Sequence, residues 1–113
     1  MENAFEAEVT LAGDGAVVVM RGTVNRSAKD ALEKAYEEAC QPSGRVLLDF
    51  REVDYINSTG IAVIVGILAM ARAENRDVGA FGLSEHYREV FTITRLADFM
   101  TIYEDETAAV AAK

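Results

Sequence analysis

One stretch of the sequence decides the fold: residues 47–61, LLDFREVDYINSTGI. It begins in an apolar run at 46–50, which has the composition of a buried strand, and a loop is expected after it. The small polar residues Asn57 to Gly60 then stand before a long apolar segment, which predicts a helix over 58–74. Free N–H groups and the helix dipole at such a start favour a negative charge such as a phosphate.

Strands and helices alternate on both sides of this stretch. Apolar alternation or short apolar runs predict strands at 5–11, 16–21, 46–50, 77–81 and 99–103. Helical spacing predicts helices from Ser27 to about Cys40, over 58–74, after Ser84, and over 105–112. A turn at 13–15 joins the first two strands as a hairpin. The order ββαβαβαβα predicts an α/β fold, with a mixed β-sheet (initial hairpin plus parallel strands) and helices packed on it.

Ser27 is expected to cap the first helix. Its hydroxyl can accept hydrogen bonds from free N–H groups, and Asp30 three residues later completes a capping-box pattern. Ser84 is expected to cap the third helix in the same way.

Composition limits the classes of function. The 113 residues, 50% of them hydrophobic, predict one domain over 1–113. The net charge of −8 disfavours binding to nucleic acid and to anionic lipid. It suits a protein partner of basic or mixed charge, or it only keeps the protein soluble. One Cys and one His exclude an intrachain disulfide and predict neither a metal nor a cofactor. The N-terminus lacks a signal-like apolar core, and the longest apolar run, 61–71, is shorter than the ~20 residues of a membrane span, so a cytoplasmic protein is expected.

The predicted helix at 58–74 is apolar on every side. Such a helix is either buried by its neighbours or presents an apolar face to a partner. A chain of 113 residues has difficulty enclosing a helix completely, which favours a partner-facing strip near the helix start. A central helix covered by its neighbours is the alternative.

These segments resemble STAS domains, as found in bacterial anti-sigma factor antagonists. The signature there is a strand, a short loop, and Asp-Ser-Ser/Thr-Gly-Leu at the start of an apolar helix, which residues 46–50 and 55–64 resemble. Residues 20–25 resemble the family's Gly-x-x-Asp segment, and residues 90–99 resemble the end of its third helix. The resemblance covers nearly the whole chain in the same element order, and it implies a STAS-like single domain.

The resemblance implies a regulatory binding protein and not an enzyme. In that family the domain binds an anti-sigma factor kinase and so frees a sigma factor. The kinase phosphorylates the first Ser of the motif, here Ser58, and a phosphatase reverses this. Phosphate adds about −1.5 to −2 charges, which would block docking by repulsion and bulk. The implied partner-binding residues are Asn25, Asn57, Ser58, Thr59, Gly60 and Ile61, in a monomer or weak dimer.

The chain departs from the family at Asn25 and Asn57, where Asp is usual, and at Arg95, where Gly is frequent. Asn keeps the hydrogen-bonding shape of Asp and loses its charge, which bears on kinase recognition of Ser58. The alternatives are a constitutively binding member, a different kinase, or a non-phosphorylated scaffold or accessory subunit of a stress-signalling or lipid-transport complex. In the last case Ser58 would be only a helix N-cap.

The other polar residues give only weak indications of a functional site. Asp49, Glu52 and Asp54 follow a strand and could hold a divalent cation, although most such clusters are solvated strand ends. His86 is expected on the surface, and Cys40 is expected to be a small packing residue. No catalytic constellation is visible.

Overall fold

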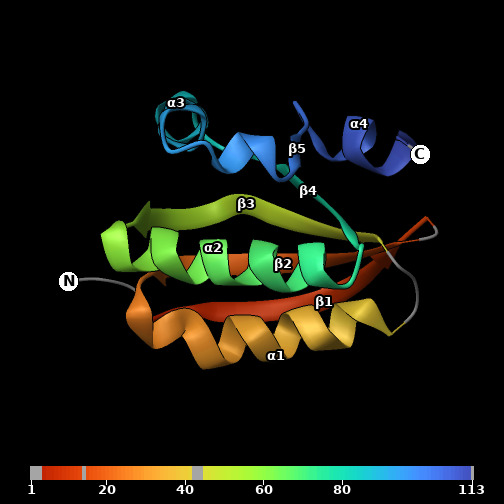
Figure 1. The fold of residues 1–113 in the computed structure, drawn as a ribbon. Coiled ribbons are helices and arrows are strands. Elements are labelled where there is room, and N and C mark those ends of the chain that lie inside the picture. Colours follow the sequence, from red (N-terminus) through yellow and green to blue (C-terminus); the bar gives the residue numbers. More distant parts are fainter. Residues whose placement is uncertain (1–3, 14, 42–44, 113) are drawn as a thin grey trace.

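The computed structural model describes residues 4–13, 15–41 and 45–112, and strands and helices alternate along them (Figure 1). The strands are β1 (Glu6–Ala12), β2 (Gly15–Val24), β3 (Arg45–Ile56), β4 (Asp77–Phe81) and β5 (Thr101–Ile102). The α-helices are α1 (Lys29–Cys40), α2 (Ser58–Ala73), α3 (Glu85–Ile93) and α4 (Glu106–Ala111), and the 3-10 helices are η1 (Arg26–Ala28) and η2 (Leu96–Asp98). The predicted order ββαβαβαβα is confirmed.

The five strands form one sheet in the order β1-β2-β3-β4-β5. β1 and β2 pair antiparallel as a hairpin, whereas β2–β3, β3–β4 and β4–β5 pair in parallel. The mixed sheet of an initial hairpin plus parallel strands is therefore confirmed.

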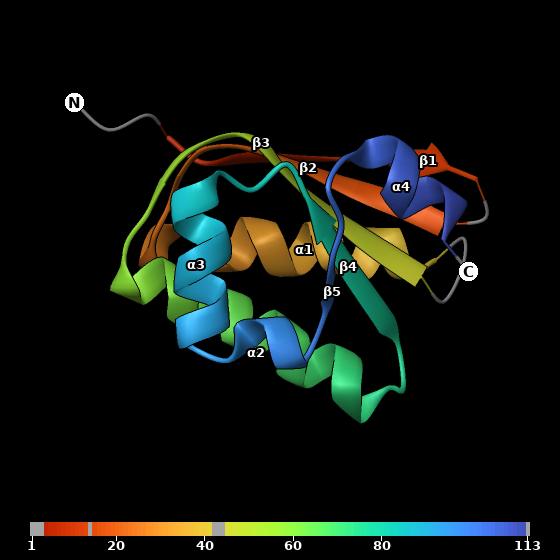
Figure 2. The ribbon, with the colours of Figure 1, turned by 90° about the horizontal axis from the view of Figure 1, so that it is seen from above.

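The two faces of the sheet are covered by different helices, because successive residues of a strand point to opposite faces. Val18 and Leu48 belong to the large core under α1 and α2, to which Phe91 of α3 also contributes. Their neighbours Val17 and Leu47 belong to a smaller core that includes Ala109 of α4. Figure 2 shows α4 on the side of the sheet opposite α1 and α2. Apolar cover on both faces explains the continuous apolar runs of β2 and β3.

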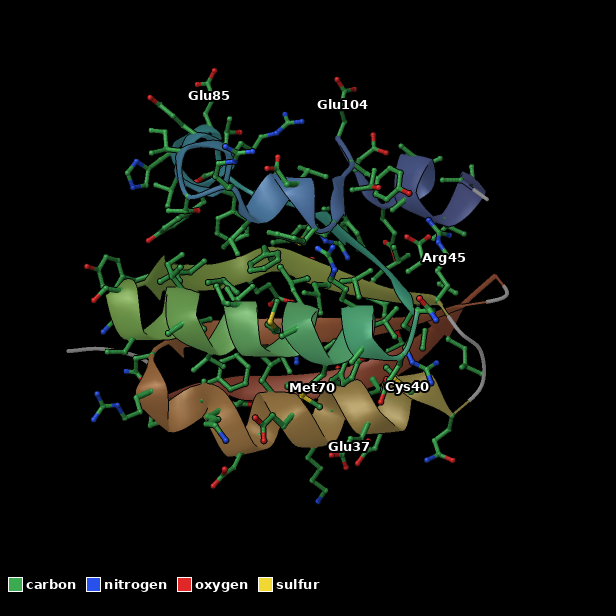
Figure 3. All side chains as sticks on the ribbon, in the orientation of Figure 1. Glu37, Cys40, Arg45, Met70, Glu85 and Glu104 are labelled. Carbon is green, nitrogen blue, oxygen red and sulfur yellow. The ribbon has the colours of Figure 1, made fainter. Side chains whose placement is uncertain are left out.

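α1 and α2 pack against each other on the larger core. In Figure 3, Cys40 and Met70 point into the space between these helices, whereas Glu37 points away from it. Cys40 and Met70 are both partly buried against the core. Cys40 therefore takes the packing position that the sequence predicts.

α2 is buried on one side only. Its buried residues are Gly60, Val63, Ile64, Ile67, Leu68 and Ala71. An exposed strip runs along its other side from the helix start to the helix end, and that this strip faces a partner stays a prediction. In the part of the chain that the structure describes, no helix is long and apolar enough to cross a membrane.

β3 is longer than the sequence predicts. A loop is expected after 46–50, but β3 continues to Ile56. Its charged second half pairs with the end of β2, where the register shifts twice and Gly22 has a φ of 89°. Because of these irregularities the residues of this half do not alternate between apolar and polar, so the sequence does not indicate a strand here. The loop prediction is therefore wrong, and β3 leads almost directly into α2.

Two further boundaries differ from prediction. The side-chain oxygen of Asn25 accepts hydrogen bonds from the Ser27 N–H at 2.9 Å and the Ser27 hydroxyl at 2.6 Å. Asn25 thus caps η1, and α1 begins at Lys29 without a side-chain cap, so the capping box at Ser27 is wrong. The last strand is short because η2 occupies 96–98, which leaves only Thr101–Ile102 in the sheet.

Candidate functional site

Asn25 and Asn57 follow two neighbouring strands at the same edge of the sheet. The parallel pair β2–β3 ends with Val24 opposite Ile56, and an Asn directly follows each. The N–H of Asn57 also donates to the Val24 carbonyl at 3.2 Å. Carboxyl ends of parallel strands are where open α/β sheets place their ligands. The fold therefore brings both Asn residues to the start of α2, as the sequence predicts.

Asn57, and not Ser58, caps α2. Its Oδ1 accepts hydrogen bonds from the Gly60 N–H at 2.9 Å and from the Thr59 hydroxyl at 2.7 Å. Ser58 is the first residue of α2 and is exposed, and no hydrogen bond of its hydroxyl is found among the described residues. The expectation that Ser58 would be the N-cap in a scaffold protein is therefore wrong, while the scaffold function itself stays an alternative. Its hydroxyl is accessible and is not needed to hold the helix.

Thr59 joins the two loops of the site. Its hydroxyl donates to Asn57, and the same oxygen accepts a hydrogen bond from the Arg26 N–H at 2.9 Å. Arg26 begins η1, directly after Asn25. One side chain thus fixes the β2–α1 connection against the start of α2.

The two Asn residues act in these contacts only as acceptors. Asn25 uses Oδ1 toward Ser27, and Asn57 uses Oδ1 toward Thr59 and Gly60. A carboxylate offers the same acceptors. The departure from the family's Asp therefore removes two negative charges but preserves the hydrogen bonds that shape the site.

Gly60 is buried where α2 meets the end of β2. A Cβ at this position would collide with the carbonyl group of Val24 and would lie 3.1 Å from Cγ2 of Ile56. Only glycine lets the first turn of α2 approach the sheet so closely. Gly60 therefore positions α2, and through it the exposed hydroxyl of Ser58.

α3 holds the strand end that precedes the site. The Tyr87 hydroxyl oxygen accepts a hydrogen bond from the Ile56 N–H at 2.8 Å, and the hydroxyl donates to the Ile56 carbonyl at 3.4 Å. Ser84 caps α3 as predicted, accepting from the Tyr87 N–H at 3.2 Å. No motif in the sequence indicates this role of Tyr87, because the partner lies 31 residues away.

The charges around the start of α2 bear on whether it can hold a phosphate. The first turn of α2 holds no acidic residue. A groove of about 340 Å³ beside it is lined by Arg26, Lys29, Glu33, Thr59, Ala62, Val63 and Gly66. Lys29 pairs with Glu33 at 3.1 Å. The helix dipole and Arg26 thus favour a negative charge here, on a chain of net charge −8.

The other predicted polar residues lie elsewhere. Asp49 is 1% exposed and pairs with Arg51 at 2.8 Å, and this hydrogen bond raises the pKa of Arg51. Glu52 pairs with Arg21 at 3.3 Å. No three His, Cys, Asp or Glu side chains that could hold a metal ion come together among residues 4–13, 15–41 and 45–112. His86 is exposed on α3, as predicted.

The structure therefore gathers Asn25, Asn57, Ser58 and Thr59 at one edge of the sheet. Gly60 lies buried beneath them, and Ile61 is half-buried against the core. Whether these residues contact a partner remains a prediction.

Comparison with known proteins agrees with the geometry. Residues 7–102 match the family model described as "Mlab, STAS domain". The anti-sigma-B factor antagonist of Listeria monocytogenes is 31% identical over 86 residues, which cover 75% of each chain. An anti-sigma factor antagonist from Mycobacterium paratuberculosis has a similar structure, with a TM-score of 0.76, 17% identity and 96% coverage of each chain.

Bacillus SpoIIAA in its phosphorylated form is also similar in fold, with a TM-score of 0.66 and 18% identity, over 94% of this chain and 96% of that one. At such identities the solved structures show the fold alone. The family model spans most of the chain and the Listeria relative exceeds 30% identity. The chain therefore belongs to the STAS domain family, among relatives named as anti-sigma factor antagonists.

Proposed function

We propose that this protein binds an anti-sigma factor kinase and so releases a sigma factor, and that phosphorylation of Ser58 switches this binding off. The observation that carries the proposal is the exposed Ser58 hydroxyl at the start of α2, next to an Asn57 that supplies the cap. The names of the relatives support the class of function.

Phosphorylation is compatible with the fold at this position. The kinase transfers the γ-phosphoryl group of ATP to Oγ of Ser58, the hydroxyl proton leaves, and ADP is released. The product carries about −1.5 to −2 charges at a helix N-terminus, where the dipole stabilises them. Because Asn57 holds the cap, the helix start stays intact while the surface gains charge and bulk. A phosphatase that removes the phosphate restores the binding surface.

Purified anti-sigma factor kinases of the source organism provide the test. Each is mixed with the protein, first without ATP to measure affinity by calorimetry, then with Mg-ATP to locate phosphate by mass spectrometry. We expect one kinase to bind and to place one phosphate on Ser58. Ser58→Ala should abolish the phosphate, whereas Ser27→Ala, which changes another exposed serine of the site, should not. Ser58→Asp should weaken binding at least tenfold.

Two results would contradict the proposal. One is that no kinase binds the wild-type protein. The other is that a bound kinase leaves Ser58 unmodified and binds Ser58→Asp as tightly as wild type. A large homo-oligomer in light scattering, with Ser58 unmodified, would favour the scaffold function instead.

A further inference from the structure

We infer that the surface that binds the anti-sigma factor kinase continues along α2 to an apolar groove at the C-terminal end of this helix. The groove takes an apolar side chain of the kinase, and a carboxylate of the kinase lies beside that side chain. This inference rests on the proposed function. The groove, here called the α2–η2 groove, has a volume of about 270 Å³. It is lined by Val65, Leu68, Ala69, Arg72, Thr94, Leu96 and Phe99.

The exposed strip of α2 connects Ser58 to this groove. The exposed positions of the helix are 58, 62, 65, 66, 69, 72 and 73. At about 100° per residue these positions share one side of the helix. A helix rises about 1.5 Å per residue, so the strip from Ser58 to Arg72 is roughly 20 Å long. A partner seated at Ser58 and lying along α2 therefore reaches the groove.

Large apolar side chains at the groove are exposed to solvent. Val65 is 46% exposed and Phe99 is 50% exposed, above a floor that includes the buried Leu68 and Leu96. Exposed apolar side chains over an apolar floor mark an interaction site, and an aromatic ring beside an arginine is enriched at the core of protein interfaces. An apolar side chain of a partner would remove these carbons from water.

The positive charge of Arg72 at the groove determines which polar group of a partner would be stabilised there. The guanidinium of Arg72 lies over the Phe99 ring, 5.2 Å from its centroid. Asp77 and Asp98 line the adjoining surface with it, but among the described residues they pair with Arg45 and Arg95, and no ion pair of Arg72 is found. Arg95, nearby in sequence to the lining residues, is instead paired with Asp98 at 2.8 Å. A carboxylate on the partner would complete the pairing of Arg72 beside the apolar contact. A second copy of this chain is disfavoured because each copy has a net charge of −8.

The test uses the anti-sigma factor kinase that binds the wild-type protein. Val65→Glu and Arg72→Glu should each weaken its affinity at least tenfold, and Arg72→Gln should make binding less sensitive to salt. Leu11→Glu is the matched control, because Leu11 is a 73% exposed apolar residue of the edge strand β1 and lines neither the α2–η2 groove nor the Ser58 edge. Thermal melting checks that the variants remain folded. At saturating kinase, both groove variants should still be phosphorylated on Ser58.

The outcomes separate this inference from the proposed function. If no kinase binds the wild type, both fail. If Ser58→Asp weakens binding and the groove variants bind like wild type, only the groove inference is overturned. If sedimentation shows a homodimer that Val65→Glu dissociates, a second copy occupies the groove and the inference is likewise overturned.

Discussion

Gly60, in the first turn of α2, lies directly against the carbonyl group of Val24, the last residue of β2. The contact fixes how closely α2 approaches the sheet, and the backbone cannot yield as a flexible side chain could. Asn57, Ser58 and Thr59 surround this contact point in sequence, so their placement depends on it. The single Gly of the motif is thus explained by packing.

Replacing this glycine should destabilise the fold. Gly60→Ala should lower the free energy of unfolding by about 1–3 kcal/mol, because the added Cβ overpacks against main-chain atoms. Gly66, in the same helix, is the matched control, since a Cβ there meets nothing within 4 Å. Gly66→Ala should raise stability by about 0.5–1 kcal/mol through helix propensity. Urea unfolding measures both, and an equal change in the two variants would contradict the packing argument.

The capping assignment can be tested on adjacent residues. Asn57→Ala should cost about 0.5–2 kcal/mol of unfolding free energy, because the Gly60 N–H loses its acceptor. Ser58→Ala should change stability by less than about 0.5 kcal/mol, because the exposed hydroxyl holds no cap. Asn57→Asp should retain the cap and gain about 0.3–1 kcal/mol from the helix dipole. The opposite ranking of Asn57→Ala and Ser58→Ala in urea unfolding would make Ser58 the cap after all.

The sequence predicts the order of elements because each long element has a clear apolar period or a strong end signal. β1 alternates between exposed and half-buried residues, and Ser84 caps α3 as the pattern indicates. The second half of β3 escapes prediction because its pairing with β2 is irregular and its residues are charged and mostly exposed. Local composition there resembles a loop, and only the long-range partner makes it a strand.

The chemistry of the site is harder to predict than its location. Ser27 and Ser58 both have the residue type of an N-cap, yet an Asn holds each cap. Sequence alone ranks Asn and Ser as equal caps, so spacing cannot choose between neighbours. Tyr87 is missed because its hydrogen bond to Ile56 joins residues that are distant in the chain.

The tie between Tyr87 and Ile56 should matter locally. Tyr87→Phe should cost about 0.5–1.5 kcal/mol, because the buried Ile56 N–H loses its acceptor. Amide hydrogen exchange at Ile56 and Asn57 should become faster. Tyr103→Phe is the control. It removes a hydroxyl that accepts a hydrogen bond from Arg45 at 3.2 Å, at the other end of β3. If exchange at Ile56 accelerates equally in both variants, the effect is global and Tyr87 has no special role at the site.

Glu74, at the end of α2, should make stability depend on pH. Its carboxylate accepts hydrogen bonds from Arg76 and from the Tyr36 hydroxyl, both at 3.1 Å, and these lower the pKa of Glu74 below its ordinary value of 4.5. Because the folded pKa is the lower one, the stabilisation is present above the unfolded pKa and is lost as pH falls through the folded value. Between about pH 5 and pH 3, Glu74→Gln should therefore lose less stability than wild type.

Tyr36→Phe removes one of the two groups that donate hydrogen bonds to Glu74. The stability that this variant loses between about pH 5 and pH 3 should therefore lie between the losses of wild type and of Glu74→Gln. Glu37→Gln is the control, because this side chain points away from α2 (Figure 3). The urea midpoint of each variant at the two pH values gives the comparison. If Glu74→Gln and Glu37→Gln show the same pH dependence, the bonds to Tyr36 and Arg76 do not favour the ionised carboxylate.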